Sequence, residues 1–314
     1  MSGLCIENKQ MYNIAICISA EPRYWSRAAD SISRLKQLHP DCRIDVFYHF
    51  WDNITKRQSH LIDDFEIEKI DKELLYNNFK PVFGVCESKE GLNPHLDLAW
   101  EYIENLKSTY NMKPAALREG LDKKENFCKM VKTTNCPPFS QLISMCKSFV
   151  YMIEYAEKHN INYDIVIRTR SDVEILPISR PKLQAVIKKD KLSRYIQFPS
   201  IAVRTPGAND PIFFNSVEDK CMYHTPFAEY CFFVSSLKIL NKNIFNNYTE
   251  KLIKLLFRIK NKNKPDRVGV TYLSSHNCVP LFLKQQPETQ LGAPIGGFDY
   301  KLKQMDIVGD IHAS

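Results

Sequence analysis

The chain has 314 residues, of which 44% are hydrophobic and 25% are charged, and this composition of an ordinary globular protein excludes a mainly disordered chain. Its 43 basic and 36 acidic residues give a formal charge of +7, which favours an anionic ligand without choosing among nucleic acid, nucleotide-sugar phosphates and acidic glycans. The cysteines include no C-x-x-C spacing, which excludes the ordinary zinc-binding pattern and favours a reducing compartment.

Residues 1–11 are polar and are predicted to form a flexible leader. They lack the apolar segment of a secretory signal, and the chain has no run of about 18 apolar residues that would span a membrane. We therefore expect a soluble, cytoplasmic protein in which residues 12–314 form a single domain.

The first regular elements form a strand–helix–strand unit. Tyr12–Ser19 is a continuous apolar run, typical of a strand buried on both faces. Trp25–Leu38 carries apolar residues at helical spacing, and Pro40 follows its end. Ile44–Trp51 is a second apolar run. Two buried strands joined by one helix predict a parallel sheet.

The middle of the chain is less regular. Residues 52–137 have weak periodicity, and we expect an irregular helical insertion at about 88–138 that includes an amphipathic helix at Leu96–Leu106. Regular spacing returns at Ser140–His159, which predicts a helix with Ser140 as its N-cap. The apolar run within Asp164–Arg170 then predicts a third core strand.

The last third of the chain is predicted to add further strands and helices, the final helix being kinked or ended by Pro280. The predicted strands are Ile196–Val203 and Pro211–Asn215, and the predicted helices are Phe227–Leu240, Tyr248–Ile259 and Leu273–Leu283. The fold class is therefore α/β: a Rossmann-like, central mixed and mostly parallel sheet flanked by helices.

Four charged residues stand at alternate positions around the end of the third core strand: Arg168, Arg170, Asp172 and Glu174. Because alternate residues of an extended chain share a face, their side chains are predicted to point the same way, at the end of the strand where open α/β sheets bind ligands. The carboxylates suit Mg²⁺ or Mn²⁺, and the arginines suit phosphate. The pattern predicts a site for a metal and a nucleotide diphosphate. The alternative is a structural ion-pair network.

The first two strands are predicted to end at the same edge of the sheet. Ser19 and Arg23 follow the first strand, and we expect both to bind the nucleotide. The alternative for this segment is a proline-containing turn before a helix. His49 ends the second strand beside aromatic residues and is also assigned to the nucleotide, although a packed histidine is the commoner role for such a residue.

Three segments together carry a resemblance to one family: IAICISAEPRYW, DVFYHFW and YDIVIRTRSDVE. They are similar to GT-A-type glycosyltransferases of bacterial and large-virus surface-glycan biosynthesis. In those proteins the first strand ends in S-G-x-x-R, the second reads D-V-F-x-H-x-W, and a later strand reads Y-D-x-x-I-R-x-R-x-D. The resemblance covers roughly residues 12–52 and 139–216, and Ala20 stands where the family has glycine.

The resemblance implies a GT-A-like catalytic domain that moves a sugar from a nucleotide-sugar donor to a glycan or glycoprotein acceptor. It places Asp172 at the metal-binding D-x-D position and Arg23 at the arginine of the first motif. Glu174 does not match the family pattern; it is added from the alternation of the strand, as the second acid of a D-x-E variant. The implied cofactor is Mn²⁺ or Mg²⁺. In this kind of fold the loop after the metal strand faces the reacting sugars, so Asp210 is a candidate general base for an inverting transfer. The alternative for Asp210 is an Asn-Asp-Pro turn.

The basic tract 251–267 raises other partners, because its leucines and isoleucines form a helical stripe with lysines beside it. Such a helix can rest on an anionic membrane or contact nucleic acid, and it is commonest as a solvated face over a core. We expect no nucleic-acid partner and keep a peripheral membrane contact open. The alternatives to sugar transfer are a nucleotidyltransferase using the same carboxylates, a basic nucleic-acid-binding module without catalysis, and an inactive scaffold.

Overall fold

The computed structural model describes the central sheet and most of the helices around it. The residues described are 11–22, 25–57, 65–112, 122–133, 138–171, 173–175 and 245–259, with the short segments 179–181, 183–184, 195–196, 233–235, 270–271, 290–291 and 300–302. No helix in these ranges is long and apolar enough to cross a membrane.

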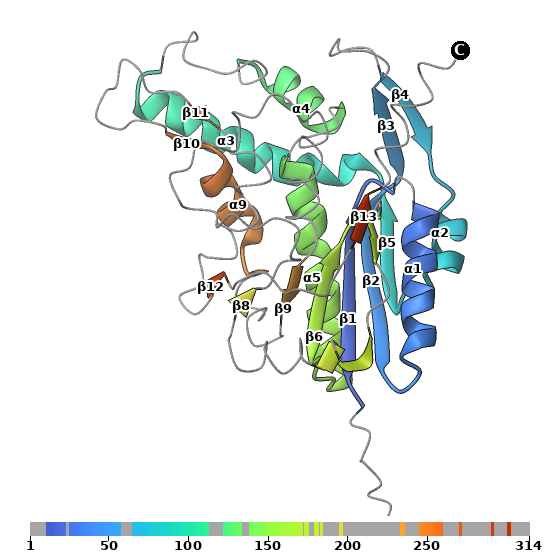
Figure 1. The fold of residues 1–314 in the computed structure, drawn as a ribbon. Helices are drawn as coiled ribbons and strands as arrows, with labels where there is room; N and C mark the ends of the chain where they lie inside the picture. The colour runs from blue at the N-terminus through green and yellow to red at the C-terminus, as the bar shows by residue number, and fades with distance from the viewer. Residues whose placement is uncertain are drawn as a thin grey trace, which may run out of the picture.

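The core is a five-stranded sheet with the order β5-β2-β1-β6-β9 (Figure 1). Four neighbouring strands are parallel, and β9 runs antiparallel to β6 at one edge. The strands are β1 (Asn13–Ala20), β2 (Arg43–Trp51), β5 (Phe83–Glu87), β6 (Ile165–Thr169) and β9 (Phe233–Ser235). The predicted Rossmann-like α/β class, with a mixed and mostly parallel sheet, is confirmed at this level.

The order of the strands creates a switch point. The chain builds β1, β2 and β5 in one direction and then places β6 on the other side of β1. In open α/β sheets the ligand crevice lies outside the carboxyl ends of the strands where the direction of winding changes. We therefore expect a ligand site at the carboxyl ends of β1 and β6.

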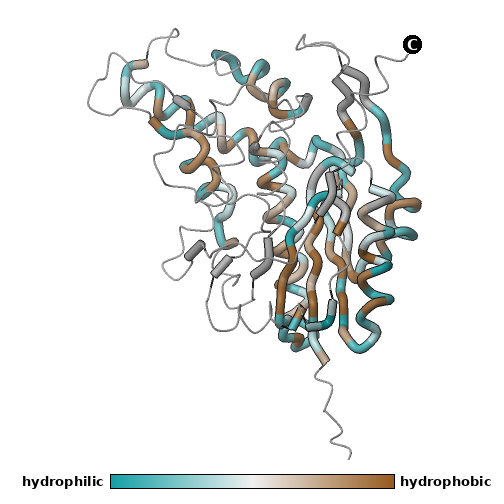
Figure 2. Tube along the Cα trace, viewed as in Figure 1, coloured by the Kyte–Doolittle hydropathy of each residue, from teal (hydrophilic) through white to brown (hydrophobic). Residues whose placement is uncertain are grey.

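Helices cover both faces of the sheet (Figure 1). α1 (Trp25–Leu38) and α2 (Lys72–Phe79) pack against one face, and α5 (Pro138–His159) packs against the other. The alternation of β1 explains this arrangement, because Ile16 and Ile18 belong to the core under α1, whereas Ala15 and Cys17 belong to the core under α5. Figure 2 shows the hydrophobic strands enclosed between these layers.

Three further helices extend the α5 side: α3 (Asn93–Thr109), α4 (Lys124–Thr133) and α9 (Tyr248–Leu256). α3 follows a short 3₁₀ turn, η1 (Lys89–Leu92), directly after β5. α9 packs on both α3 and α5 through Leu252, Ile253 and Leu256, which are buried. The stripe of the basic tract therefore faces the core in α9, and residues 260–267 lie outside the described ranges.

The remaining strands form small two-stranded pairs. The hairpin of β3 (Asn53–Arg57) and β4 (Phe65–Lys69) is antiparallel. The other pairs are β7 (Val173–Ile175) with β13 (Tyr300–Leu302), β8 (Tyr195–Ile196) with β12 (Gln290–Leu291), and β10 (Arg258–Ile259) with β11 (Val270–Thr271). β13 thus brings a C-terminal segment beside the residues that follow β6.

Some predictions from the sequence were wrong in whole or in part. Within Phe227–Leu240, where a helix was predicted, Phe233–Ser235 forms the strand β9, because pairing with the edge of β6 outweighs the helical spacing. The helix predicted at Tyr248–Ile259 is confirmed as far as Leu256, and its last residues instead pair with β11.

Two corrections concern the middle of the chain. Ser140, predicted as an N-cap, lies inside α5, which begins at Pro138. The stretch 52–137, interpreted as an insertion of weak periodicity, contains the core strand β5, and the helix predicted at Leu96–Leu106 is confirmed within α3.

Gly84 shows why β5 is easily missed in the sequence. It lies opposite Tyr48 of β2, and the Tyr48 ring atoms lie 2.5–2.7 Å from the place where a Cβ would stand. Only glycine leaves room for this ring, although glycine is uncommon within strands. The predicted elements at Pro211–Asn215 and Leu273–Leu283, and the part of Ile196–Val203 after Ile196, lie outside the described residues.

Candidate functional site

The carboxyl edge of β1 and β6 brings Ser19 and Arg168 together. Both side chains are fully buried, and the Arg168 guanidinium donates a hydrogen bond to Oγ of Ser19 at 3.1 Å. Arg168 lies opposite Cys17 in the β1–β6 register, so both arginine and serine project on the α5 face of the sheet. A buried guanidinium at this edge is costly to desolvate, and such groups are concentrated where an anion or a hydrogen-bond network compensates them.

The residues that follow β6 continue this edge. Arg170 comes directly after Thr169, where β6 ends, and is 7% exposed. Ser171 is fully buried and donates from its Oγ to the backbone carbonyl of Glu21 at 2.8 Å. The turn after β6 is thereby tied to the turn after β1. Ser19 and Arg168 thus meet at the switch point, and Arg170 follows directly after the end of β6.

The other predicted site residues divide into two groups. Arg23, Asp172 and Asp210 lie outside the described residues. Glu174 lies in β7, opposite Lys301 of β13, and its side chain is outside the described part. Over the ranges that the structure describes, no group of three or more His, Cys, Asp or Glu side chains could hold a metal ion. The metal site therefore stays a prediction that depends on Asp172 and Glu174.

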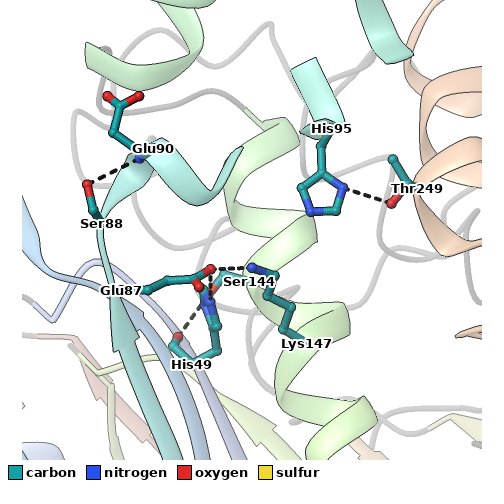
Figure 3. A network of polar contacts seen from close by, with 8 residues as sticks. All are labelled: His49, Glu87, Ser88, Glu90, His95, Ser144, Lys147 and Thr249. Carbon is teal, nitrogen blue, oxygen red and sulfur yellow. Dashed lines mark hydrogen bonds and ion pairs between the residues drawn. The ribbon is translucent and has the colours of Figure 1, made fainter. Parts of the chain in front are cut away.

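His49 is at the centre of a buried polar network (Figure 3). The side chain is 0% exposed. Its Nε2 lies 2.9 Å from Oε1 of Glu87, and its Nδ1 lies 2.9 Å from Oγ of Ser144 in α5. Ser144 Oγ also lies 2.8 Å from the backbone carbonyl of His49. Both ring nitrogens of His49 are already in hydrogen-bond contact, so the ring links β2 to β5 and α5. A ligand at this position would contact Glu87 before His49, because the Glu87 side chain is 31% exposed and that of His49 is fully buried.

Glu87 is a candidate site residue that the sequence interpretation missed. It ends β5 on the same face as Phe83 and Val85, and Lys147 of α5 contacts the same oxygen, Oε1, that accepts from His49. The signal was present: a short apolar strand ends in an acid, and Ser88 caps the turn that follows. The place of Glu87 at the carboxyl edge of the sheet can be inferred only after residues 83–87 are recognised as a strand.

The charges of this network follow from its contacts. The hydrogen bond from His49, assisted by that from Lys147, lowers the pKa of Glu87 to about 2. Burial lowers the pKa of His49, and its hydrogen bond to Glu87 opposes that effect. A neutral His49 then carries its proton on Nε2, which donates to Glu87, while the Ser144 hydroxyl donates its single proton to the His49 backbone carbonyl and its Oγ lies 2.9 Å from Nδ1.

A second histidine lies near this group. His95 of α3 contacts Oγ1 of Thr249 in α9 through its Nδ1 at 2.9 Å. Burial lowers its pKa to about 4, and the positive charge of Lys147 adds to the shift. His95 is therefore neutral at pH 7, and it packs beside Tyr248, with ring centroids 6.1 Å apart.

Stability should fall on acidification below about pH 6.5, because the unfolded chain then binds protons that the folded His95 and His49 resist. This contribution is fully present above the unfolded pKa and is lost as pH falls from about 6.5 towards about 4. Replacing His95 with asparagine should flatten the dependence of the free energy of unfolding on pH in this window, as measured by urea denaturation. An equal slope in wild type and His95→Asn would contradict the assignment.

An ion pair joins the ends of two strands at the same edge. Lys89 of η1 contacts Oε1 of Glu21, after β1, at 2.6 Å, and it also donates to the backbone carbonyl of Lys132 at 2.9 Å. Lys89 is 6% exposed. Because a buried pair of this kind fixes geometry more than it adds stability, it holds the segment after β5 against the segment after β1.

Comparison with known proteins identifies no relative: no family model, no curated protein and no solved structure matches the chain.

Proposed function

We propose that the protein is a nucleotide-sugar-dependent glycosyltransferase of GT-A-like fold, whose donor diphosphate binds outside the carboxyl ends of β1 and β6. The observation that carries this proposal is the fully buried Arg168, hydrogen-bonded to Ser19 across the switch point. Arg170 follows directly after the end of β6 and is 7% exposed. Two guanidinium groups at the ligand-binding edge of a parallel sheet match the geometry and charge of a diphosphate.

The chemistry assigned to these residues is stabilisation of a leaving group. Breaking the bond between sugar and diphosphate leaves additional negative charge on the nucleotide, and Arg168, Arg170 and Arg23 would bind that charge through N–H donors. Asp172 and Glu174 would hold Mn²⁺ or Mg²⁺, which when bound neutralises part of the same charge. Asp210 would take the proton of the acceptor hydroxyl in an inverting transfer.

The alternative of a nucleic-acid-binding module finds less support in the described residues. In α9 the apolar stripe faces the core, and Lys254 pairs with Glu250 four residues earlier on the surface. The described part of the basic tract is thus an ordinary amphipathic helix over a core. A glycan or glycoprotein acceptor fits the proposal. A peripheral membrane contact would have to involve residues 260–267.

The proposal predicts that a nucleoside diphosphate stabilises the protein. A ligand at about one hundred times its Kd adds about 2.7 kcal/mol to the free energy of unfolding, which a thermal-shift measurement detects readily. Uridine, guanosine, cytidine and adenosine diphosphates should be compared, each with and without Mn²⁺. We expect one base to be preferred and the Mn²⁺-dependent part of the shift to disappear in Asp172→Ala.

Asp30→Ala is the matched control, because Asp30 is exposed on α1. It should keep the full shift. A wild-type protein that none of the four diphosphates stabilises, with or without metal, would overturn the proposed function. If a nucleoside diphosphate does stabilise the protein, a donor screen that follows hydrolysis of a nucleotide-sugar panel would identify the sugar.

A further inference from the structure

A second group of polar side chains lies beside the edge strand β5, on the α5 face of the sheet. It consists of Glu87 at the end of β5, Lys147 of α5 and His95 of α3 (Figure 3). The side chains of Glu87 and Lys147 are 31% and 17% exposed. Lys147 and Glu87 both act electrostatically on His95, so the three form one cluster. The nucleotide proposal uses none of these groups.

Each member of the cluster keeps hydrogen-bonding capacity. His49 and Lys147 both contact Oε1 of Glu87, and Oε2 has no hydrogen-bond partner among the residues that the structure describes. Lys147 has three N–H donors, and Oε1 of Glu87 is its acceptor within the same ranges. His95 uses Nδ1 for Thr249, which leaves Nε2. The cluster therefore offers an acceptor, a donor and a ring nitrogen at a partly exposed position.

The charges of the cluster cancel. Glu87 is ionised, because its hydrogen bonds to His49 and Lys147 lower its pKa to about 2, and Lys147 carries the matching positive charge. His49 and His95 are neutral at pH 7, since burial lowers the pKa of each. A cluster with no net charge has no long-range attraction for a phosphate or a cation. Its ligand should be neutral and should both donate and accept hydrogen bonds.

Aromatic rings lie beside Lys147 and continue along the α5 face of β5 towards Phe83. The Lys147 ammonium lies 5.5 Å from the centroid of the Trp51 ring, and Tyr151 packs edge-on against Phe83 with centroids 4.9 Å apart. Phe83 is 47% exposed on the edge strand. Burial, with the negative charge of Glu87, raises the pKa of Tyr151 to about 12, so its hydroxyl stays neutral. Rings with an apolar body beside polar groups suit a ligand that has both kinds of surface.

We propose that the Glu87–Lys147–His95 cluster is a binding site for a neutral sugar ring. Sugar hydroxyls both donate and accept, so one hydroxyl can donate to Oε2 of Glu87 while a neighbour accepts from Lys147. The C–H face of the ring would lie against Tyr151, one helical turn after Lys147 on α5. This inference rests on the proposed function only in one respect: in a glycosyltransferase, the sugar would belong to the acceptor glycan.

The test measures sugar binding without any nucleotide. Wild-type protein is titrated with D-glucose, D-galactose, D-mannose and N-acetylglucosamine, using saturation-transfer NMR and calorimetry up to about 50 mM. We expect at least one of them to bind with Kd on the order of 1 mM. Glu87→Gln and Lys147→Met should each weaken that sugar about tenfold, because each removes a charged hydrogen-bonding partner. Glu250→Gln and Lys254→Met, from the exposed pair on α9, should bind as wild type.

Charged sugars supply a signature that a purely structural role would not produce. Wild type should prefer the neutral sugar over glucuronate and glucosamine. Glu87→Gln leaves a net positive cluster and should shift preference towards glucuronate, whereas Lys147→Met leaves a net negative cluster and should shift it towards glucosamine. Gly91→Ala probes the geometry with no change of charge, since a Cβ there would stand 3.0–3.3 Å from the Glu87 carboxylate atoms, and it should weaken the neutral sugar.

The outcomes separate this inference from the proposed function. If no neutral sugar binds wild type while a nucleoside diphosphate stabilises it, the sugar site is overturned and the proposed function stands. If a sugar binds equally well to wild type, Glu87→Gln and Lys147→Met, its site lies elsewhere and the inference also fails. Sugar binding with the expected charge shifts, but without nucleotide stabilisation, would support the sugar site and contradict transfer from a nucleotide donor.

Discussion

Arg168→Lys should weaken the stabilising nucleoside diphosphate at least tenfold, and Arg168→Met should abolish measurable binding. The lysine keeps the charge but loses the planar fork that donates two parallel hydrogen bonds to phosphate oxygens. A tenfold loss corresponds to about 1.4 kcal/mol of binding free energy, the range expected for a charged hydrogen bond. Isothermal titration calorimetry with the preferred diphosphate measures the change directly.

The control for this prediction is Arg34→Lys, because Arg34 is an exposed arginine on α1. A buried arginine also contributes to folding, so Ser19→Ala provides a second test that removes only the hydroxyl to which Arg168 donates. We expect Ser19→Ala to weaken the diphosphate by a smaller factor. Unchanged affinity in a folded Arg168→Lys protein would remove the main support for a diphosphate at this edge.

His49→Ala should lower the free energy of unfolding by about 3 kcal/mol. The fully buried imidazole fills space between β2 and α5, and its two nitrogens contact Glu87 and Ser144. Its removal leaves a cavity and takes from Glu87 and Ser144 their contacts with the ring. Urea denaturation at pH 7 measures the loss, and His49→Gln, which keeps a donor and an acceptor, should recover part of it.

The exposed His159 at the end of α5 is the matched site, where alanine should cost less than about 0.5 kcal/mol. The sequence-based assignment of His49 to the nucleotide predicts a different pattern: a large loss of diphosphate affinity with little loss of stability. The two patterns are separated by measuring both quantities on the same variant. A stable His49→Ala protein that no longer binds the diphosphate would favour direct contact over the structural link.

Several parts of the fold could be predicted from the sequence. β1, β2 and β6 contain apolar residues at consecutive positions, which is typical of strands buried on both faces, whereas a half-exposed strand alternates apolar and polar residues. The helical spacing of apolar residues in α1 and α5 is clear over several turns. Alternation also predicts the face of Arg168 within β6, which the register with Cys17 of β1 places on the α5 side, because the side-chain period of a strand is set by local backbone geometry.

The partners of those residues depended on tertiary structure. Nothing local marks Glu87 as the contact of His49, because the two strands are joined only by a sheet register in which Trp51 lies opposite Glu87. The strand that carries Glu87 contains Gly84, whose lack of a side chain suits the Tyr48 ring and weakens the strand signal. Similarly, β9 is a strand because β6 offers an open edge.

The sequence alone therefore determined the layers, the core strands β1, β2 and β6 and the cationic edge at Arg168, since these follow from periodicities that each segment carries in itself. Only the tertiary structure decided that His49 is a buried link and that Glu87 and Lys147 form a neutral polar cluster beside β5. The physical reason is that hydrogen bonds between residues distant in the chain, and the pKa shifts they cause, exist only after the strands and helices have packed.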